Sequence, residues 1–196
     1  DASNIALGKA SLQSLHKYKQ DSDDKISSGN NKIYGENTAI GHYSLFRNIE
    51  GYRNTAIGKR TLTNNFYGNN NTALGVASLY FLGNKEDYGT DQNNNDNTAV
   101  GAEAQYSLMT GQKNTSIGMQ SMRYIDSGNN NTAIGQNAMA GVKGDTNGLI
   151  NATAANNTVA PKGNNNTVIG SSALSEHILG NYNVALGAES CTKIHN

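Results

Sequence analysis

Polar and apolar residues alternate in a short motif that recurs along the chain: an asparagine, usually a threonine, a small residue, an aliphatic residue and a glycine. The nine copies are NIALG at Asn4, NTAIG at Asn37, Asn54 and Asn131, NTALG at Asn71, NTAVG at Asn97, NTSIG at Asn114, NTVIG at Asn166 and NVALG at Asn183. Five of the eight steps between copies share the same 17-residue length, which therefore defines the repeating unit.

A second element follows each motif glycine at a fixed distance. Three residues later stands a small residue, such as Ser44 or Thr61, and the next residue is usually Leu or Met, such as Leu45 or Leu62. Segments this short between glycines do not nucleate helices, whereas alternation is typical of strands. The pattern therefore predicts an all-β parallel β-solenoid of about nine 17-residue coils, in which like residues stack every ~4.8 Å.

The strand alternation also predicts two faces. The threonine and the aliphatic residue share one face, and the asparagine, the small residue and the glycine share the other. We expect the aliphatic face to be buried, which turns the threonine inward. The small residues would then lie outside, where they allow neighbouring chains to approach closely. These small residues are Ala39, Ala56, Ala73, Ala99, Ser116 and Ala133.

The motif asparagines are expected to form a ladder in which each side-chain amide donates to one neighbour and accepts from the other. This predicted structural ladder consists of Asn37, Asn54, Asn71, Asn97, Asn114, Asn131, Asn166 and Asn183. For the additional asparagines, as in the run at 69–71, turn formation is the favoured interpretation, since Asn tolerates the left-handed region. Asn70, Asn130 and Asn165 also stand in N-x-[ST] sequons, which leaves glycosylation as the alternative.

Composition and charge narrow the function classes. Asparagine outnumbers the 22 glycines, and the formal net charge is zero, which gives no electrostatic reason to expect a nucleic-acid partner. The longest apolar runs are a few residues, so we expect no membrane insertion in this fragment. The chain begins at Asp1, and we interpret residues 1–196 as a single solenoid domain within a longer protein.

The NTAIGxxSL pattern resembles the repeats of trimeric autotransporter adhesin heads of the YadA type and those of viral and bacteriophage tail fibres. The resemblance covers nearly the whole chain. It implies a homotrimer of left-handed β-rolls on a virion surface or an extracellular cell surface, used to attach to a host-cell glycan or protein receptor. The 17-residue step and the threonine at Thr38, Thr55 and Thr72 favour the viral fibre group over the bacterial adhesin heads, which remain the alternative.

Three steps exceed this 17-residue unit, which places insertions within 13–36, 80–96 and 140–165. All three enter at the same point of the unit, so they are expected to leave the solenoid from one edge, where repeat proteins often collect binding loops. Their aromatic and polar residues are the candidate receptor contacts, although packing of these aromatic residues against the solenoid is the competing interpretation. The candidates are His16, Tyr18, Tyr34, Tyr80, Phe81 and Tyr88.

No catalytic or metal-binding constellation emerges from the sequence. Cys191 stands where other copies carry Leu or Met, so we expect a buried apolar role. Asp21, Asp23 and Asp24 fit no calcium-loop spacing, and the four histidines are scattered, so we expect no metal, no cofactor and no enzymatic activity. A glycan-cleaving site between subunits, built from carboxylates of different chains, is the enzymatic alternative.

An ice-binding solenoid is a further hypothesis, because seven of the nine copies carry threonine at the same position. Such a function needs a flat threonine array that faces outward. The expected burial of the neighbouring aliphatic residue argues against it.

Overall fold

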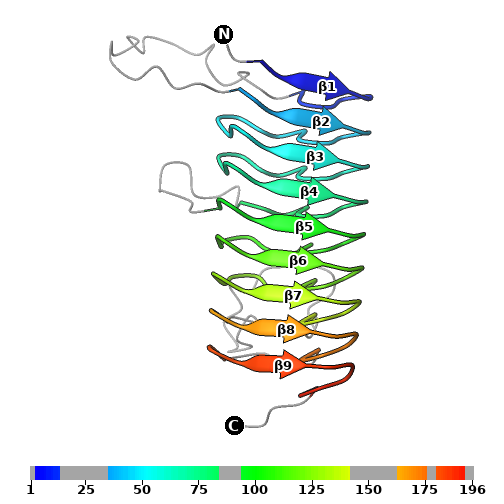
Figure 1. Ribbon diagram of the computed structural model, residues 1–196. Helices are drawn as coiled ribbons and strands as arrows, with labels where there is room; N and C mark the ends of the chain where they lie inside the picture. The colour runs from blue at the N-terminus through cyan, green and yellow to red at the C-terminus, as the bar shows by residue number, and fades with distance from the viewer. Residues whose placement is uncertain (1–2, 14–34, 84–93, 142–162, 176–179, 193–196) are drawn as a thin grey trace, which may run out of the picture.

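The computed structural model describes residues 3–13, 35–83, 94–141, 163–175 and 180–192, which form a stack of coils (Figure 1). The described residues contain nine short strands and no helix. The strands are β1 (Ile5–Leu7), β2 (Thr38–Ile40), β3 (Thr55–Ile57), β4 (Thr72–Leu74), β5 (Thr98–Val100), β6 (Thr115–Ile117), β7 (Thr132–Ile134), β8 (Thr167–Ile169) and β9 (Val184–Leu186). They form one parallel sheet in chain order, which confirms the predicted β-solenoid architecture.

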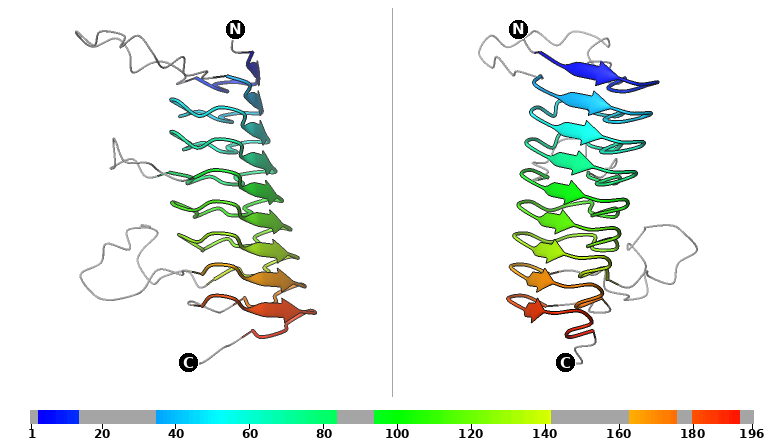
Figure 2. Two further views of the ribbon diagram at one scale, coloured as in Figure 1. Left: turned by 60° about the vertical axis from the view of Figure 1, so that its left-hand side comes forward. Right: turned by 45° about the vertical axis from the view of Figure 1, so that its right-hand side comes forward.

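Equivalent residues of successive coils are paired throughout the sheet. Ile40 is the register partner of Ile57, and Ile57 is the partner of Leu74. The long steps do not disturb this register, because Thr72 pairs with Thr98 and β7 pairs with β8 in the same way. Each motif therefore forms one rung of the stack. Figure 2 shows the strands on one side of the stack and the turns on the other; we call these the strand side and the turn side.

Each strand ends at a glycine because successive coils approach backbone to backbone there. Gly101 has a φ of 135°, and a Cβ atom added to it would lie 2.5 Å from the carbonyl oxygen of Gly118 in the next coil. No side chain fits this distance, and L-residues rarely adopt this φ. The glycine column thus sets how closely the coils stack.

Three further positions in each coil are left-handed without being glycine. Counting the motif asparagine as position 1, these are positions 7, 9 and 17, and position 9 has φ values of 47° at Leu45, 49° at Leu62 and 50° at Met122. A residue branched at Cβ is strongly disfavoured in this region, whereas an unbranched one fits. This explains why the apolar residue at position 9 is Leu or Met and never Ile or Val. The position is held by Leu12, Leu45, Leu62, Leu79, Gln105, Met122, Met139, Leu174 and Cys191.

The interior contains the small residues of the strands and the position 9 side chains. Ala56, Ser116 and Leu62 are fully buried, whereas Leu74 and Ile117 at the third strand position are 44% and 41% exposed. The expected orientation of the two strand faces is therefore wrong. The small residues point inward, and the threonines and aliphatic residues point outward.

The asparagine at position 1 explains this reversal. Asn54 donates from Nδ2 to the carbonyl oxygen of Gly68 at 2.8 Å, a contact between buried residues of the same coil. Because alternate strand residues share a face, a buried position 1 also turns position 3 inward. The interior space next to the small residue is then filled by the position 9 side chain, here Leu62.

The expectation for Cys191 is also wrong, because this side chain is exposed. Position 9 is buried only where the next coil covers it, as Leu174 is by the β9 coil. Among the described residues, no coil follows that of β9.

Candidate functional site

The position 1 asparagines form a continuous hydrogen-bonded column. The backbone N–H and Nδ2 of Asn54 both donate to Oδ1 of Asn37, at 2.9 and 3.1 Å, and Nδ2 also donates to the Gly68 carbonyl. The same donation to the preceding asparagine is made by Asn37, Asn71, Asn97, Asn114, Asn131, Asn166 and Asn183. The side-chain N–H groups and oxygen of each asparagine within the column therefore hydrogen-bond inside the solenoid and are not available to a ligand.

A second asparagine column stands at position 16 and runs in the opposite direction. The N–H and Nδ2 of Asn129 donate to Oδ1 of Asn164, at 2.9 and 3.2 Å, and Asn164 donates likewise to Asn181. In the position 1 column the donors point to the preceding coil, and in this column they point to the following one. The first and third asparagines of an NNN run therefore belong to two separate ladders.

The middle asparagine of the run occupies position 17, in the left-handed region. Asn70, Asn130 and Asn165 have φ values of 57°, 56° and 56°, and all three are exposed. This backbone conformation agrees with the turn interpretation of these residues. They are also the three sequon asparagines.

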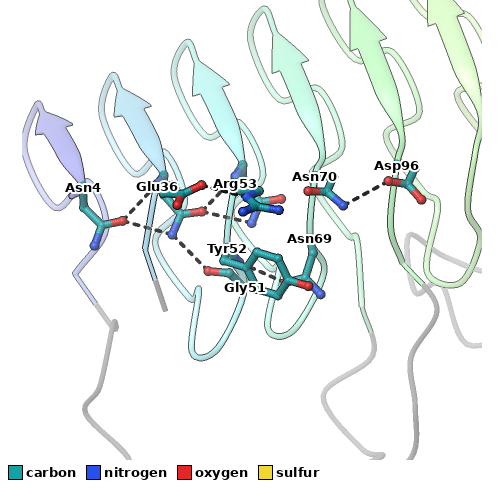
Figure 3. A network of polar contacts seen from close by, with 10 residues as sticks. Asn4, Glu36, Gly51, Tyr52, Arg53, Asn69, Asn70 and Asp96 are labelled. Carbon is teal, nitrogen blue, oxygen red and sulfur yellow. Dashed lines mark hydrogen bonds and ion pairs between the residues drawn. The ribbon is translucent and has the colours of Figure 1, made fainter. Parts of the chain in front are cut away.

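Position 17 forms a polar edge beside the strand side (Figure 3). Arg53 donates from Nε to Glu36 at 2.7 Å, and Asn70 donates to Asp96 at 3.1 Å, each across one coil step. The hydrogen bond and the charge of Glu36 raise the pKa of the Arg53 guanidinium. Both side chains of the ion pair are largely exposed, so solvent screens their attraction.

The strand side presents an unbroken column of outward aliphatic side chains. Ile169 is 41% exposed and Leu186 at the last described strand is 64% exposed. The column consists of Leu7, Ile40, Ile57, Leu74, Val100, Ile117, Ile134, Ile169 and Leu186. Val76 and Met119, each two residues after a column member, add exposed apolar area beside it. We call this surface the aliphatic face.

The threonines share this outward orientation. Thr55, Thr72 and Thr98 are consecutive register partners and are exposed or half-buried. A parallel row of threonines therefore runs beside the aliphatic column along β2 to β8. This row faces outward, contrary to the expectation from the sequence.

A different surface carries a cluster of aromatic rings in mutual contact. At position 10, Tyr80 and Tyr106 of neighbouring coils stack with their ring centroids 5.3 Å apart and an interplanar angle of 8°. Phe81 packs edge-on against both rings, at 4.6 and 5.3 Å. We call this surface the aromatic stripe; it comprises Phe46, Tyr80, Phe81, Glu103, Tyr106, Arg123 and Tyr124, all half-buried.

Charged groups lie at one end of the aromatic stripe. Glu103 accepts hydrogen bonds at Oε2 from Arg123 at 2.7 Å and from Gln120 at 3.0 Å. The Arg123 guanidinium also lies 4.8 Å from the centre of the Tyr124 ring, within cation–π distance. Burial raises the pKa of the Tyr106 phenol, and the nearby Tyr80 and Glu103 raise it further.

The structure places only two of the six predicted contact residues. Tyr80 and Phe81 belong to the regular coil that carries β4, where they contact Tyr106, and not to an irregular insertion. His16, Tyr18, Tyr34 and Tyr88 lie outside the described residues, as do Asp21, Asp23 and Asp24.

Sequence reasoning missed Tyr106 and its neighbours Glu103 and Arg123. A signal was present, since the separation of Tyr80 and Tyr106 along the chain equals that of the motif asparagines Asn71 and Asn97. The two tyrosines therefore had to occupy the same position in neighbouring coils. Counting Tyr80 as part of an insertion concealed this equivalence.

Within the described ranges, no group of three or more His, Cys, Asp or Glu side chains could hold a metal ion. No helix in that part of the chain is long and apolar enough to cross a bilayer. Comparisons with protein-family models, curated proteins and solved structures gave no match to this chain.

Proposed function

We propose that the chain is an attachment region of a homotrimeric viral or phage fibre, in which three left-handed coils pack through their aliphatic faces. The observation that carries this proposal is the row of nine outward aliphatic side chains, five of which are 41–66% exposed. Monomeric soluble proteins rarely expose contiguous apolar surface of this extent, and such surface is typical of protein interfaces.

The energetics favour burial of this face by a partner. Full burial of a Leu or Ile side chain contributes roughly 1.5–3 kcal/mol, so covering its exposed part contributes about 1 kcal/mol. Nine coils then contribute several kcal/mol per chain, which is comparable with the lower estimates of the cost of association. Within one chain the strands bury only Ala, Ser or Val, and the large buried side chains come from the turns, as Leu62 and Leu108 do.

A second copy of the chain matches this face better than an unrelated partner does. Its aliphatic column has the same spacing and the same length, so rungs of two copies can meet at every coil. The described part of the β4 coil ends at Gly83 and that of the β7 coil ends at Gly141, in both cases after the turns that follow the strand. Three copies packed through their strand sides would therefore leave these turns outside, available to a receptor.

Sedimentation equilibrium tests the proposed oligomer. The wild type is expected to sediment as a trimer, and the double substitution Ile57→Asp with Ile117→Asp is expected to give monomers with an intact far-ultraviolet spectrum. Thr110→Asp, at an exposed residue on the turn side, is the matched control and should remain trimeric. A monomeric wild type would contradict the proposal.

A cell-binding measurement tests the attachment role. Deletion of 16, 9 and 18 residues from within 14–34, 84–93 and 142–162 shortens each long step to the 17-residue unit and leaves Tyr80 and Phe81 in place. It should reduce binding to host cells while the trimer persists, because the strand register is the same across long and short steps. Unchanged cell binding by a trimer that lacks all three insertions would refute attachment through the insertions.

The outward threonine row favours one competing function, the ice-binding solenoid. The strand side presents a row of threonine side chains that are in register from β2 to β8. Thermal hysteresis measurements separate the two functions, because a trimer that covers this face cannot bind ice through it. Hysteresis from a monomeric protein would support ice binding, and its absence from a trimer would support the fibre proposal.

A further inference from the structure

The aromatic stripe is not required by the coil itself. Position 10 holds Phe46, Tyr80, Tyr106 and Arg123 in the coils of β2, β4, β5 and β6, and the smaller, buried Thr63 in that of β3. It holds only Ala140 and Ser175 in the coils of β7 and β8. Those two coils keep the same strand register without a large side chain at this position. The enrichment in the central coils therefore has a cause other than folding of the repeat.

The tyrosines of the stripe are held in a fixed arrangement. Tyr80 and Tyr106 are parallel to within 8°, and Phe81 contacts both rings edge-on. All three are half-buried, so part of each ring faces solvent. Aromatic rings that are already ordered bind a ligand with little loss of side-chain entropy.

Hydrogen-bonding groups of both kinds lie beside these rings. The Glu103 carboxylate supplies an acceptor and the Arg123 guanidinium a donor, and their 2.7 Å ion pair fixes both side chains. The ring faces and edges provide apolar contact, and the phenol hydroxyls can donate or accept. This combination suits a ligand that has apolar C–H patches and many hydroxyl groups, which is the chemistry of a carbohydrate.

The shape of the stripe distinguishes a chain-like ligand from a globular partner. Position 10 from the β2 coil to the β6 coil spans four coil steps, roughly 20 Å at ~4.8 Å per step. The stripe is only two or three side chains wide, so its area is on the order of a few hundred Å², well below the ~800 Å² per partner of a standard protein interface. A narrow surface whose large side chains recur at the same position of neighbouring coils, interrupted by Thr63 in the β3 coil, fits an extended polymer parallel to the stack.

We propose that the aromatic stripe is a binding site for a linear carbohydrate chain that lies along the solenoid axis and stacks against Tyr80 and Tyr106. Glu103 and Arg123 hydrogen-bond to its hydroxyl groups. This inference rests on the proposed attachment function and names the ligand class and a site for it on the solenoid itself, separate from the insertions.

A printed array of linear oligosaccharides, with neutral and acidic members of three to eight sugars, tests the site. The wild-type protein should retain a subset of the longer members. Tyr80→Ala and Tyr106→Ala should each weaken the apparent affinity roughly tenfold, and Glu103→Gln should weaken it less. Tyr182→Ala is the matched control, because Tyr182 is 79% exposed and lies outside the stripe.

Tyr106→Phe and thermal unfolding of each variant separate binding from folding. Tyr106→Phe preserves the packing with Tyr80 and Phe81, so it should fold normally and bind more weakly only through the lost hydroxyl. Equal loss of binding in Tyr182→Ala, unchanged binding in both tyrosine-to-alanine variants, or no oligosaccharide retained by the wild type would each overturn the proposal. Host-cell binding of the same variants distinguishes the two hypotheses, since attachment that survives both alanine substitutions leaves the fibre function intact.

Discussion

At the scale of single residues, the chain uses the left-handed region as a regular part of its coil. Leu62 is fully buried with a φ of 49°, and its counterparts Leu45 and Met122 have φ values of 47° and 50°. The strand, in contrast, holds Thr, Ile and Val on its outer surface, where branching at Cβ fits extended backbone. Branched and unbranched apolar residues therefore have separate places in each coil.

This separation predicts different outcomes for two similar substitutions at position 9. Leu62→Met keeps an unbranched side chain and should cost less than about 1.5 kcal/mol of unfolding free energy. Leu62→Ile conserves volume but forces a branched residue into the left-handed region, so it should cost about 1–2 kcal/mol more. Urea denaturation of both variants checks this, with Ile57→Leu in the strand as the control; equal losses for Met and Ile would contradict the backbone explanation.

Gln105 is the one buried polar side chain at position 9 among the described residues. Its Nε2 donates to the carbonyl oxygen of Thr98 at 3.0 Å, but its Oε1 is buried without a hydrogen-bond partner. A buried acceptor without a donor costs about 1–3 kcal/mol.

Gln105→Met should therefore raise the unfolding free energy by about 1 kcal/mol, because it removes the unpaired oxygen and keeps an unbranched side chain. The reverse change in the next coil, Met122→Gln, should lower it. Thermal unfolding of the two variants measures whether each change raises or lowers stability. A stability loss in Gln105→Met would indicate that the bond to Thr98 outweighs the unpaired oxygen.

At the scale of the coil element, the asparagine ladders supply the contacts that the small strand residues do not. Asn114 donates to Asn97 and Gly128 and accepts from the backbone and side chain of Asn131. All these groups are buried, so each bond satisfies a donor or acceptor that would otherwise be unpaired. The ladders thus join neighbouring coils where little apolar surface is available.

Asn114→Ala should consequently cost about 3–5 kcal/mol, since it removes several buried hydrogen bonds and leaves the partners in both adjacent coils unpaired. Asn183→Ala is the matched comparison, because Asn183 donates to Asn166 and no described coil follows it. The unfolding free energy lost in Asn183→Ala should be less than half of that lost in Asn114→Ala. Equal losses in equilibrium unfolding would argue against a ladder in which central rungs contribute most.

The repeat predicted most of the coil from the sequence, because equal spacing determines which residues become register partners. The 17-residue step placed Ile40, Ile57 and Leu74 in one column, as the sheet has them. Alternation could not decide which face is buried, because both faces carry residues that pack well in a core. The buried face is determined by the hydrogen bond from the Asn54 side chain to the Gly68 carbonyl. This carbonyl belongs to a turn and not to a strand, so strand alternation does not predict the bond.

The aromatic stripe likewise could be predicted only in part from the sequence. The motif spacing places Tyr80 and Tyr106 at the same position of neighbouring coils, but the stacking of their rings and the edge-on packing of Phe81 follow only from the structure. The Glu103–Arg123 ion pair likewise joins position 7 of one coil to position 10 of the next. Contacts of this kind depend on side-chain directions at the turns, which the motif alone does not specify.

At the scale of the whole molecule, the stack has a thin interior and a continuous apolar exterior. Coils contact only their neighbours in the sheet, so stability should be a sum of coil and interface contributions. The large aliphatic residues of the strands add little to this sum in one chain, because they face outward. Their contribution is realised only when a partner covers the aliphatic face.

The proposed oligomerisation through this face would make stability depend on protein concentration. If folded chains associate and unfolded chains do not, mass action raises the unfolding temperature as the concentration increases. The melting temperature of the wild type should rise by several degrees between dilute and concentrated samples, whereas that of the Ile57→Asp, Ile117→Asp double variant should be lower and independent of concentration. Differential scanning calorimetry over a hundredfold concentration range measures how the melting temperature of each protein depends on concentration. A wild-type melting temperature that does not change with concentration would show that the solenoid is stable with its aliphatic face uncovered, and the threonine row beside it would then be open to water or ice.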